Sequence, residues 1–363
     1  MVPMRDGIKL ATDVYLPSAD LTGDQSPLPV ILERTPYNKT APSRSERTVS
    51  DPVPMSRERV ASFFIEHGYA VVYQDCRGRF ASEGSFTKYL SEGDDGYDTI
   101  IWMLKQSWCS GKIATMGLSY AAHAQAALAC LNPPGLACMF LDSGGFSNAY
   151  QGGIRQGGAF EMKQATWAYK QALESPAAKN NPLIEKALKS ENIKEWFSRM
   201  PWKKGHSPVK WVPEYEDYLF EQWQHGNFDD FWKQTGIYAE GFYNDFSDVP
   251  MIHMSSWFDP YARTATENYI GLKKCKKSEI CLVLGPWTHG NRCLTFFGDV
   301  DFGPEAPLDG NVEKDCFTYR LPWFDTFFKA SSTEGKKKWP EVIYFLIGGV
   351  SGLKNGEGRL IHG

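Results

Sequence analysis

The chain has 363 residues, which is long enough to bury a large core in two or three domains. Its formal net charge of −4 gives no electrostatic reason to expect nucleic acid or an anionic membrane as a partner. No apolar run reaches the length of a membrane span and the first residues do not resemble a signal peptide, so we expect no membrane partner.

The cysteines and histidines indicate a reducing compartment and no metal. The eight cysteines are scattered and none forms a Cys-x-x-Cys pair, so we expect free thiols and a cytoplasmic location. The seven histidines show neither a His-x-x-x-His spacing nor a spacing paired with Glu, which argues against a metal site. We therefore expect no metal and no cofactor.

The first 143 residues alternate predicted strands and helices. A hairpin is expected over residues 1–16, with its turn at Arg5-Asp6-Gly7. Strands follow at 27–32, 69–74, 113–118 and 138–142, and helices at 57–67, 94–105 and in the Ala-rich run after Ser119. This alternation is typical of a parallel sheet with helices on both faces. We predict that residues 1–143 are the first part of an α/β core.

A loop with several charged residues follows strand 69–74. We expect Asp75, Arg77 and Arg79 to tie this loop down beneath the site through charge-assisted hydrogen bonds, rather than to act on a substrate.

A candidate nucleophile, Ser119, lies where a predicted strand meets the Ala-rich helix. A serine hydroxyl becomes an effective nucleophile when a sharp turn exposes it beside a base. Gly117 leaves room for such a turn, although Ala121 stands where the usual Gly-x-Ser-x-Gly motif has its second glycine. The alternative interpretation is that Ser119 caps the helix. His123, one helical turn further on, is expected to be a packing residue.

Residues 144–248 differ in character because they are polar, helical in pattern and rich in large aromatic residues. An insertion of this kind between core strands predicts a helical cap over the active-site face. We expect most of its rings to form the core of the cap, and we name Trp167 as a candidate for the substrate pocket. The core is expected to resume over residues 249–335.

Two later strands each lead to a candidate partner of Ser119. The run from residue 250 ends at Asp259, and the run from residue 279 is followed by a turn that carries His289. The order Ser119, Asp259, His289 is the order of nucleophile, acid and base in α/β hydrolases. Each residue follows a predicted strand at its C-terminal end, where open α/β sheets place their chemistry. Asp142, at the end of the preceding strand, remains an alternative acid.

The last segment, residues 336–363, begins a new β unit. The run Trp339–Gly349 predicts a strand, and a single strand without partners is not stable alone. We therefore expect these residues to open a C-terminal β domain that this chain lacks.

Together these motifs resemble the cocaine esterase and Xaa-Pro dipeptidyl-peptidase group of serine hydrolases, the CocE/NonD family, over nearly the whole chain. The segments that carry the resemblance are Val2–Gly7, Leu10–Tyr15, Thr35–Tyr37, Gln74–Gly78, Ser82–Gly84, Gly117–Tyr120, Trp257–Asp259 and Gly285–His289. The resemblance implies an α/β-hydrolase core with a mostly parallel sheet, an inserted helical cap and a C-terminal jelly roll. This chain would hold only the start of the jelly roll.

The resemblance also implies a role for each site residue. Ser119 would attack the acyl carbon, His289 would take its proton, and Asp259 would hold the imidazole in the useful tautomer. The oxyanion would be held by the hydroxyl of Tyr37 and the main-chain N–H of Tyr120.

The substrate is predicted from the residues after Asp259. Relatives that hydrolyse α-amino esters carry acidic residues there, whereas this chain has Pro, Tyr, Ala and Arg at 260–263. We therefore expect a small carboxylic ester, or an amide, whose apolar acyl part rests near Trp257 and Phe258.

Two other functions are kept as alternatives. An Xaa-Pro dipeptidyl-peptidase acting on short peptides would need an anchor for a free amino terminus, for which Glu161 and Asp229 are candidates. A non-catalytic binding protein on a hydrolase fold is the second alternative. The sequence leaves a homodimer open.

Overall fold

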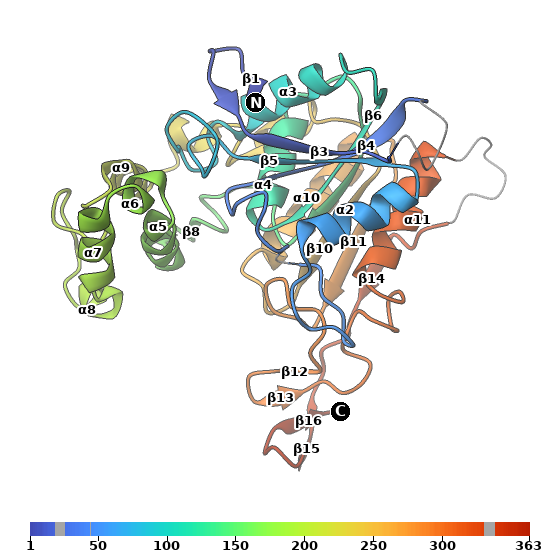
Figure 1. The fold of residues 1–363 in the computed structure, drawn as a ribbon. Coiled ribbons are helices and arrows are strands. Elements are labelled where there is room, and N and C mark those ends of the chain that lie inside the picture. Colours follow the sequence, from blue (N-terminus) through green and yellow to red (C-terminus); the bar gives the residue numbers. More distant parts are fainter. Residues whose placement is uncertain (19–25, 44, 330–337) are drawn as a thin grey trace.

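The computed structural model describes residues 1–18, 26–43, 45–329 and 338–363. Within these ranges eight strands form one central sheet in the order β14-β11-β10-β7-β6-β4-β5-β3 (Figure 1). Neighbouring strands are parallel, except that β3 pairs antiparallel with β5. The strands are β3 (Thr12–Tyr15), β4 (Leu28–Thr35), β5 (Ala70–Asp75), β6 (Cys109–Leu118), β7 (Leu136–Asp142), β10 (Met251–Ser256), β11 (Ile280–Gly285) and β14 (Val342–Tyr344).

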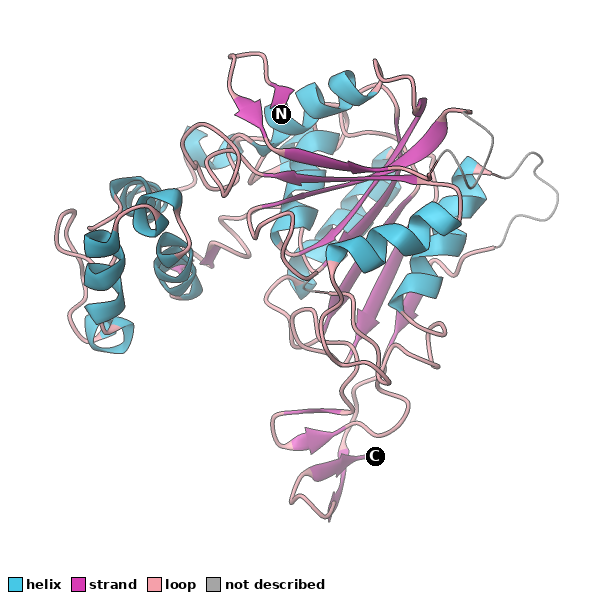
Figure 2. Cartoon of the chain, in the orientation of Figure 1, coloured by secondary structure: helices cyan, strands magenta, loops and turns pink. Residues whose placement is uncertain are grey.

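Helices cover both faces of this sheet (Figure 2), as the alternating pattern predicts. Strands β5, β10 and β11 are buried along their whole length, and their sequences are accordingly mostly apolar. The helices are α2 (Arg57–Glu66), α3 (Glu92–Met103), α4 (Tyr120–Ala129), α10 (Ala262–Cys275) and α11 (Cys316–Phe328). Phe64 of α2 and Trp323 of α11 share one buried cluster, while Leu128 of α4 and Leu272 of α10 belong to another.

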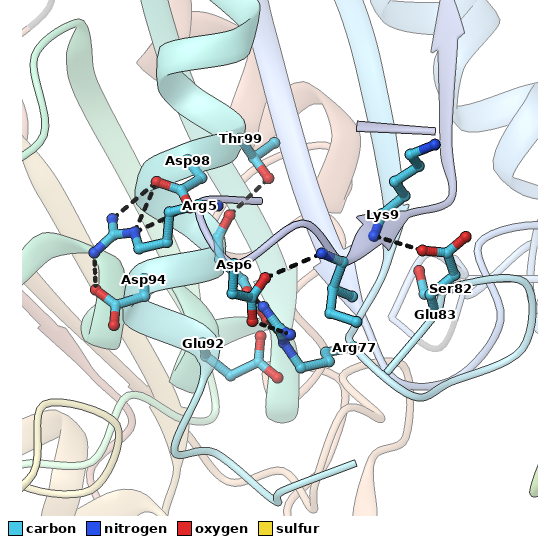
Figure 3. A network of polar contacts seen from close by, with 12 residues as sticks. Arg5, Asp6, Lys9, Arg77, Ser82, Glu83, Glu92, Asp94, Asp98 and Thr99 are labelled. Atoms are coloured by element: carbon cyan, nitrogen blue, oxygen red, sulfur yellow. Dashed lines mark hydrogen bonds and ion pairs between the residues drawn. The ribbon is translucent and has the colours of Figure 1, made fainter. Parts of the chain in front are cut away.

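The N-terminal hairpin is present, with β1 (Val2–Pro3) paired to β2 (Lys9–Leu10) and a turn between them. Its turn is fastened to α3, because Arg5 forms ion pairs with Asp94 at 2.7 Å and with Asp98 at 2.8 Å (Figure 3). Both contacts are partly exposed to solvent, so they orient the hairpin more than they stabilise it.

The stretch predicted to be a cap is mainly helical. It contains β8 (Arg155–Gln156), β9 (Ala159–Phe160), α5 (Lys163–Leu173), α6 (Pro176–Lys179), α7 (Pro182–Ser190), α8 (Ile193–Phe197), α9 (Pro213–Gln224), η1 (Asp230–Lys233) and η2 (Ala239–Phe242). Helices α5 to α9 lie together at one side of the sheet (Figure 1). Aromatic side chains form their shared core, and this core continues into Phe86 and Tyr120 of the α/β part. The cap therefore packs against the segment that follows the candidate nucleophile.

The C-terminal residues add to two sheets. Strand β14 pairs in parallel with β11 at the edge of the central sheet, so the first strand of the expected β domain is a core strand. The sequence pattern could not identify a partner for this strand. Its partner is the otherwise open edge of β11, whose main-chain N–H and C=O groups form hydrogen bonds with β14. A second sheet, with the order β12-β13-β16-β15, consists of β12 (Phe296–Phe297), β13 (Val300–Asp301), β16 (Leu360–His362) and β15 (Val350–Lys354).

The predicted segments at 249–335 and 336–363 include residues 330–337, which lie outside the described residues. Among the helices that the structure describes, none is long and apolar enough to cross a membrane.

Candidate active site

Ser119 stands on a sharp turn between β6 and α4. Its backbone has φ 63° and ψ −116°, a conformation that costs a non-glycine residue about 1–3 kcal/mol and that recurs at functional sites. The turn is held by the main chain, since the Ser119 N–H donates to the carbonyl of Asp142 at 2.8 Å. Ser119 occupies the N-cap position of α4, but its side chain accepts no capping hydrogen bond. The geometry is that of a nucleophile elbow rather than of a helix cap.

The candidate base and acid are hydrogen-bonded to each other. Nδ1 of His289 lies 2.7 Å from Oδ2 of Asp259. The other carboxylate oxygen of Asp259 accepts the main-chain N–H of Tyr261, also at 2.7 Å. The Asp259 side chain is 0% exposed, whereas the His289 side chain is 36% exposed. The buried carboxylate thus fixes the ring orientation and leaves the opposite ring nitrogen for other contacts.

The alternative acid, Asp142, has different partners. Its carboxylate is buried and forms an ion pair with Arg292, and Arg320 lies 3.7 Å away. Asp142 therefore neutralises buried arginines beneath the turn, and the structure places Asp259 against His289.

Ser119 and His289 line one cavity of about 560 Å³. Tyr37, Tyr120 and Trp167 line it as well, so five of the residues predicted for the site converge there. The lining comes from the loops that follow core strands, from the turn between β6 and α4 and from the start of α5, which places the cavity between the sheet and the cap.

The two predicted oxyanion donors differ in how they are held. The Tyr37 hydroxyl accepts a hydrogen bond from Nε1 of Trp167 at 3.1 Å, and a phenol that accepts one hydrogen bond can still donate its own hydrogen. Tyr120 begins α4, where the first N–H groups of a helix have no acceptor within the helix. Its hydroxyl instead bonds Oε1 of Glu92 at 2.9 Å and accepts the N–H of Tyr89 at 2.8 Å.

Trp257 and Phe258 do not belong to the cavity lining. The indole N–H of Trp257 donates to the carbonyl of Phe345 at 2.8 Å, and the ring is 40% exposed. The ring of Phe258 stacks on Phe297 with centroids 4.5 Å apart. Phe258 therefore contacts β12 of the small C-terminal sheet and Trp257 contacts the residue after β14, so neither ring lines the cavity as an acyl pocket.

The loop after β5 behaves as predicted. Asp75 accepts the main-chain N–H of Lys39 at 2.7 Å, and Nε of Arg79 donates to the carbonyl of Pro36 at 2.9 Å. Arg77 bonds Asp95 and reaches Asp6 of the N-terminal turn (Figure 3). These charged groups fasten the loops that support Tyr37, which confirms a structural role.

His123 is also a packing residue, as predicted. Its Nδ1 accepts the N–H of Gly145 at 2.9 Å, and its ring stacks on Phe146 with centroids 3.8 Å apart. Burial and, to a smaller extent, the neighbouring His289 hold the pKa of His123 well below its ordinary value. A neutral, buried ring suits a role in packing.

Several lining residues were not foreseen from the sequence, among them Lys88, Lys163 and Gln164. Lys88 comes from the loop before α3, whereas Lys163 and Gln164 begin α5. No local motif links these positions, because only the placement of the cap on the core brings them together.

The two candidate anchors for a peptide amino terminus lie outside the lining. Glu161 forms an ion pair with Lys163, and Asp229 bonds Nδ1 of His225 at 2.7 Å. Neither carboxylate is therefore placed as a cavity-lining anchor. Among the described residues no group of His, Cys, Asp and Glu side chains could hold a metal ion.

The chain is similar in sequence to a known protein family and to a known esterase. A family model described as X-Pro dipeptidyl-peptidase (S15 family) matches residues 6–291. The cocaine esterase of Rhodococcus sp. (strain MB1 Bresler) is 27% identical, and the match covers 96% of this chain and 57% of that protein. The chain thus spans little more than half the length of this curated relative.

Solved structures match as well. An aminopeptidase from a marine sediment Thaumarchaeota archaeon has a TM-score of 0.63 at 23% identity, over 99% of this chain and 57% of that one. A CocE/NonD family hydrolase from Staphylococcus aureus has a TM-score of 0.63 at 21% identity, over 94% and 52% of the two chains. These likenesses establish the fold, an α/β-hydrolase core with β structure in its C-terminal part.

Proposed function

This chain belongs to the X-Pro dipeptidyl-peptidase (S15) family, and from that premise we propose that it cleaves carboxylic esters, or amides, through an acyl-enzyme formed on Ser119. The single observation that carries the proposal is that His289, hydrogen-bonded to Asp259, lines the same cavity as the strained Ser119. This arrangement has the parts of a Ser-His-Asp triad on an α/β-hydrolase sheet.

The proposed mechanism follows from these positions. His289 takes the hydroxyl proton as Ser119 attacks the acyl carbon, and later delivers that proton to the leaving alcohol or amine. Asp259, held by the N–H of Tyr261, keeps Nδ1 of His289 protonated and stabilises the imidazolium. The Tyr37 hydroxyl and the Tyr120 N–H stabilise the negative oxygen of the tetrahedral intermediate. Water then repeats the sequence on the acyl-enzyme.

An ester or simple amide is favoured over an Xaa-Pro dipeptide substrate. A dipeptidyl-peptidase has to hold a cationic amino terminus, yet the described residues that line the cavity include Arg47, Lys88 and Lys163 and no Asp or Glu. Such a lining disfavours an ammonium group. The substrate we propose is a small acyl ester. We also propose a cytoplasmic location, since each of the eight cysteines, all within the described ranges, is a free thiol.

The deciding experiment combines covalent labelling with turnover. A fluorophosphonate probe should label the wild-type chain at Ser119, and Ser119→Ala should abolish labelling and lower kcat for an aryl ester by a factor on the order of 10⁶. Ser190→Ala, which changes an exposed cap serine, is the matched control and should keep both properties. A folded wild-type protein without labelling at Ser119 would favour the alternative of a non-catalytic binding protein.

A further inference from the structure

Lys88 is a buried lysine that faces the cavity without a counter-ion. It is 1% exposed and lines the cavity, and among the described residues the only charged group that acts on its amine is another cation, Lys163. Its ammonium donates to Oε1 of Gln164 at 2.7 Å and lies over the ring of Trp167, 3.9 Å from the centroid. Lysine is almost never fully buried unless it is paired, so this arrangement calls for an anion.

The surroundings hold Lys88 in place. Gln164 is oriented by a hydrogen bond from its Nε2 to the carbonyl of Gly153 at 2.7 Å, so its oxygen points at Lys88. Burial, and then the charge of Lys163, hold the pKa of Lys88 well below its ordinary value. A carboxylate entering the cavity would supply the missing negative charge and favour the protonated amine. Because the side chain is already ordered, binding would cost little conformational entropy.

The remaining charges of the cavity have the same sign. Lys163 lines it from the first turn of α5 and lies over the ring of Tyr261 at 4.7 Å, while its ammonium pairs with Glu161 outside the lining. Arg47 lines it from the core. No acidic residue belongs to the described lining, and the neighbouring carboxylates Glu161 and Asp259 are engaged by Lys163 and His289, so the charge of Lys88 favours an anion in the cavity.

The contacts of Lys88 also indicate which part of a substrate it would meet. It rests on Trp167, whose N–H bonds the hydroxyl of Tyr37, so it lies on the side of the proposed oxyanion donor. Lys163, by contrast, contacts Tyr261, whose ring lies 5.6 Å from that of His289. Since we propose that His289 protonates the leaving group, we assign Lys88 to the acyl side of the cavity.

We propose that the cavity selects esters whose acyl part carries a carboxylate, and that Lys88, oriented by Gln164 and Trp167, binds this carboxylate. This inference rests on the proposed function, because it names the substrate class of the same site. It makes Lys88 a specificity-determining residue, with Lys163 adding to the positive field.

The test compares three 4-nitrophenyl esters with six-carbon acyl chains that end in a methyl, a carboxylate or an ammonium group: the hexanoate, the monoadipate and the 6-aminohexanoate. Rates are corrected for uncatalysed hydrolysis. For the wild type we expect kcat/KM for the monoadipate to exceed that for the hexanoate about tenfold or more, with the 6-aminohexanoate lowest. A wild-type preference for the hexanoate, or equal values, would overturn the inference without any variant.

Variants then assign the preference to Lys88. Lys88→Met should lower the ratio of monoadipate to hexanoate about tenfold, and Lys88→Arg should retain more of it. Lys170→Met changes an exposed lysine of α5, the helix that carries Gln164 and Trp167, and should leave the ratio as in the wild type. If Lys88→Met folds, as judged by thermal unfolding, and keeps the wild-type ratio, Lys88 does not bind the carboxylate.

Failure of the inference can be told from failure of the proposed function. If the wild type hydrolyses none of the three esters and no probe labels Ser119, the hydrolase proposal fails. If all three esters are cleaved by Ser119 but the charge of the acyl chain has no effect, only the anionic substrate class fails.

Discussion

The indole N–H of Trp167, in the cap helix α5, donates a 3.1 Å hydrogen bond to the hydroxyl of Tyr37, in the loop after β4. The bond joins the cap to the core at the wall of the cavity and orients the hydroxyl that we propose as an oxyanion donor. The rings also contact edge to face, with centroids 6.4 Å apart. The cap therefore contributes to the geometry of the site as well as covering it.

Trp167→Phe should lower turnover by weakening the orientation of Tyr37. The substitution keeps an aromatic ring but removes the N–H, and one neutral hydrogen bond contributes about 1 kcal/mol, so we expect kcat to fall about fivefold. Trp211→Phe is the matched control, because it removes an indole bond to Glu191 elsewhere in the cap. Steady-state kinetics on an aryl ester would measure both variants, and an equal loss in the two would point to a general weakening of the cap.

Tyr37→Phe should have a larger effect than Trp167→Phe, because it removes the proposed donor itself. Loss of one oxyanion donor typically costs about 10² to 10³ in kcat. The effect should fall on kcat with little change in KM, since the donor acts when the negative oxygen forms. A loss confined to KM would instead assign Tyr37 to substrate binding.

Tyr120→Phe separates the main chain of Tyr120 from its side chain. The proposed donor is the N–H, which the variant keeps, whereas the hydroxyl that bonds Glu92 and Tyr89 is lost. Because those two partners are buried, we expect a loss of about 1–3 kcal/mol in the free energy of unfolding. The fall in kcat should be far smaller than that of Tyr37→Phe. Denaturant unfolding and kinetics on the same preparation check both statements.

Asp259→Asn should mainly lower activity, whereas Asp142→Asn should mainly lower stability. Asp259→Asn removes the partner of His289 Nδ1 and should lower kcat about 10⁴-fold. Asp142→Asn leaves the buried Arg292 without its carboxylate, so it should lower the free energy of unfolding by about 3–5 kcal/mol. If Asp142→Asn were stable and inactive while Asp259→Asn kept its activity, the two acids would exchange roles.

The core strands and the order of the candidate site residues could be predicted from the sequence, because they depend on local patterns and on position along the chain. The strand before Ser119, the strands that lead to Asp259 and His289, and the order of the three residues all follow from apolar runs with turns after them. The helices of the cap are likewise visible as a change in composition.

What could not be predicted depends on side-chain direction and on contacts between distant elements. Trp257 follows β10 just before Asp259, yet its indole N–H donates to Phe345 after β14 and its ring does not line the cavity. Lys88 and Lys163 line the same cavity only because the cap packs against the core. Strand β14 shows an apolar pattern, but its partner, the edge of β11, is decided by the topology of the whole sheet.

The close approach of Gly117 to Ala121 gives a test of how closely β6 and α4 pack at the turn that carries Ser119. Gly117 has φ 133°, and a Cβ built on it would lie 2.5 Å from Cβ of Ala121 and 3.1 Å from Cγ of Glu33. Gly117→Ala therefore adds steric overlap to backbone strain, and we expect a loss of about 2–5 kcal/mol in the free energy of unfolding.

Gly111→Ala is the matched control, since Gly111 lies in the same strand with φ 85° and nothing within 4 Å of an added Cβ. It should lose only about 1 kcal/mol, which is the backbone strain alone. In the double variant Gly117→Ala/Ala121→Gly the overlap with residue 121 is removed, so part of the loss should be recovered in a double-mutant cycle of urea unfolding. Equal losses for Gly111→Ala and Gly117→Ala, with no recovery in the double variant, would mean that the turn relaxes around the added methyl and that Ala121 does not limit it.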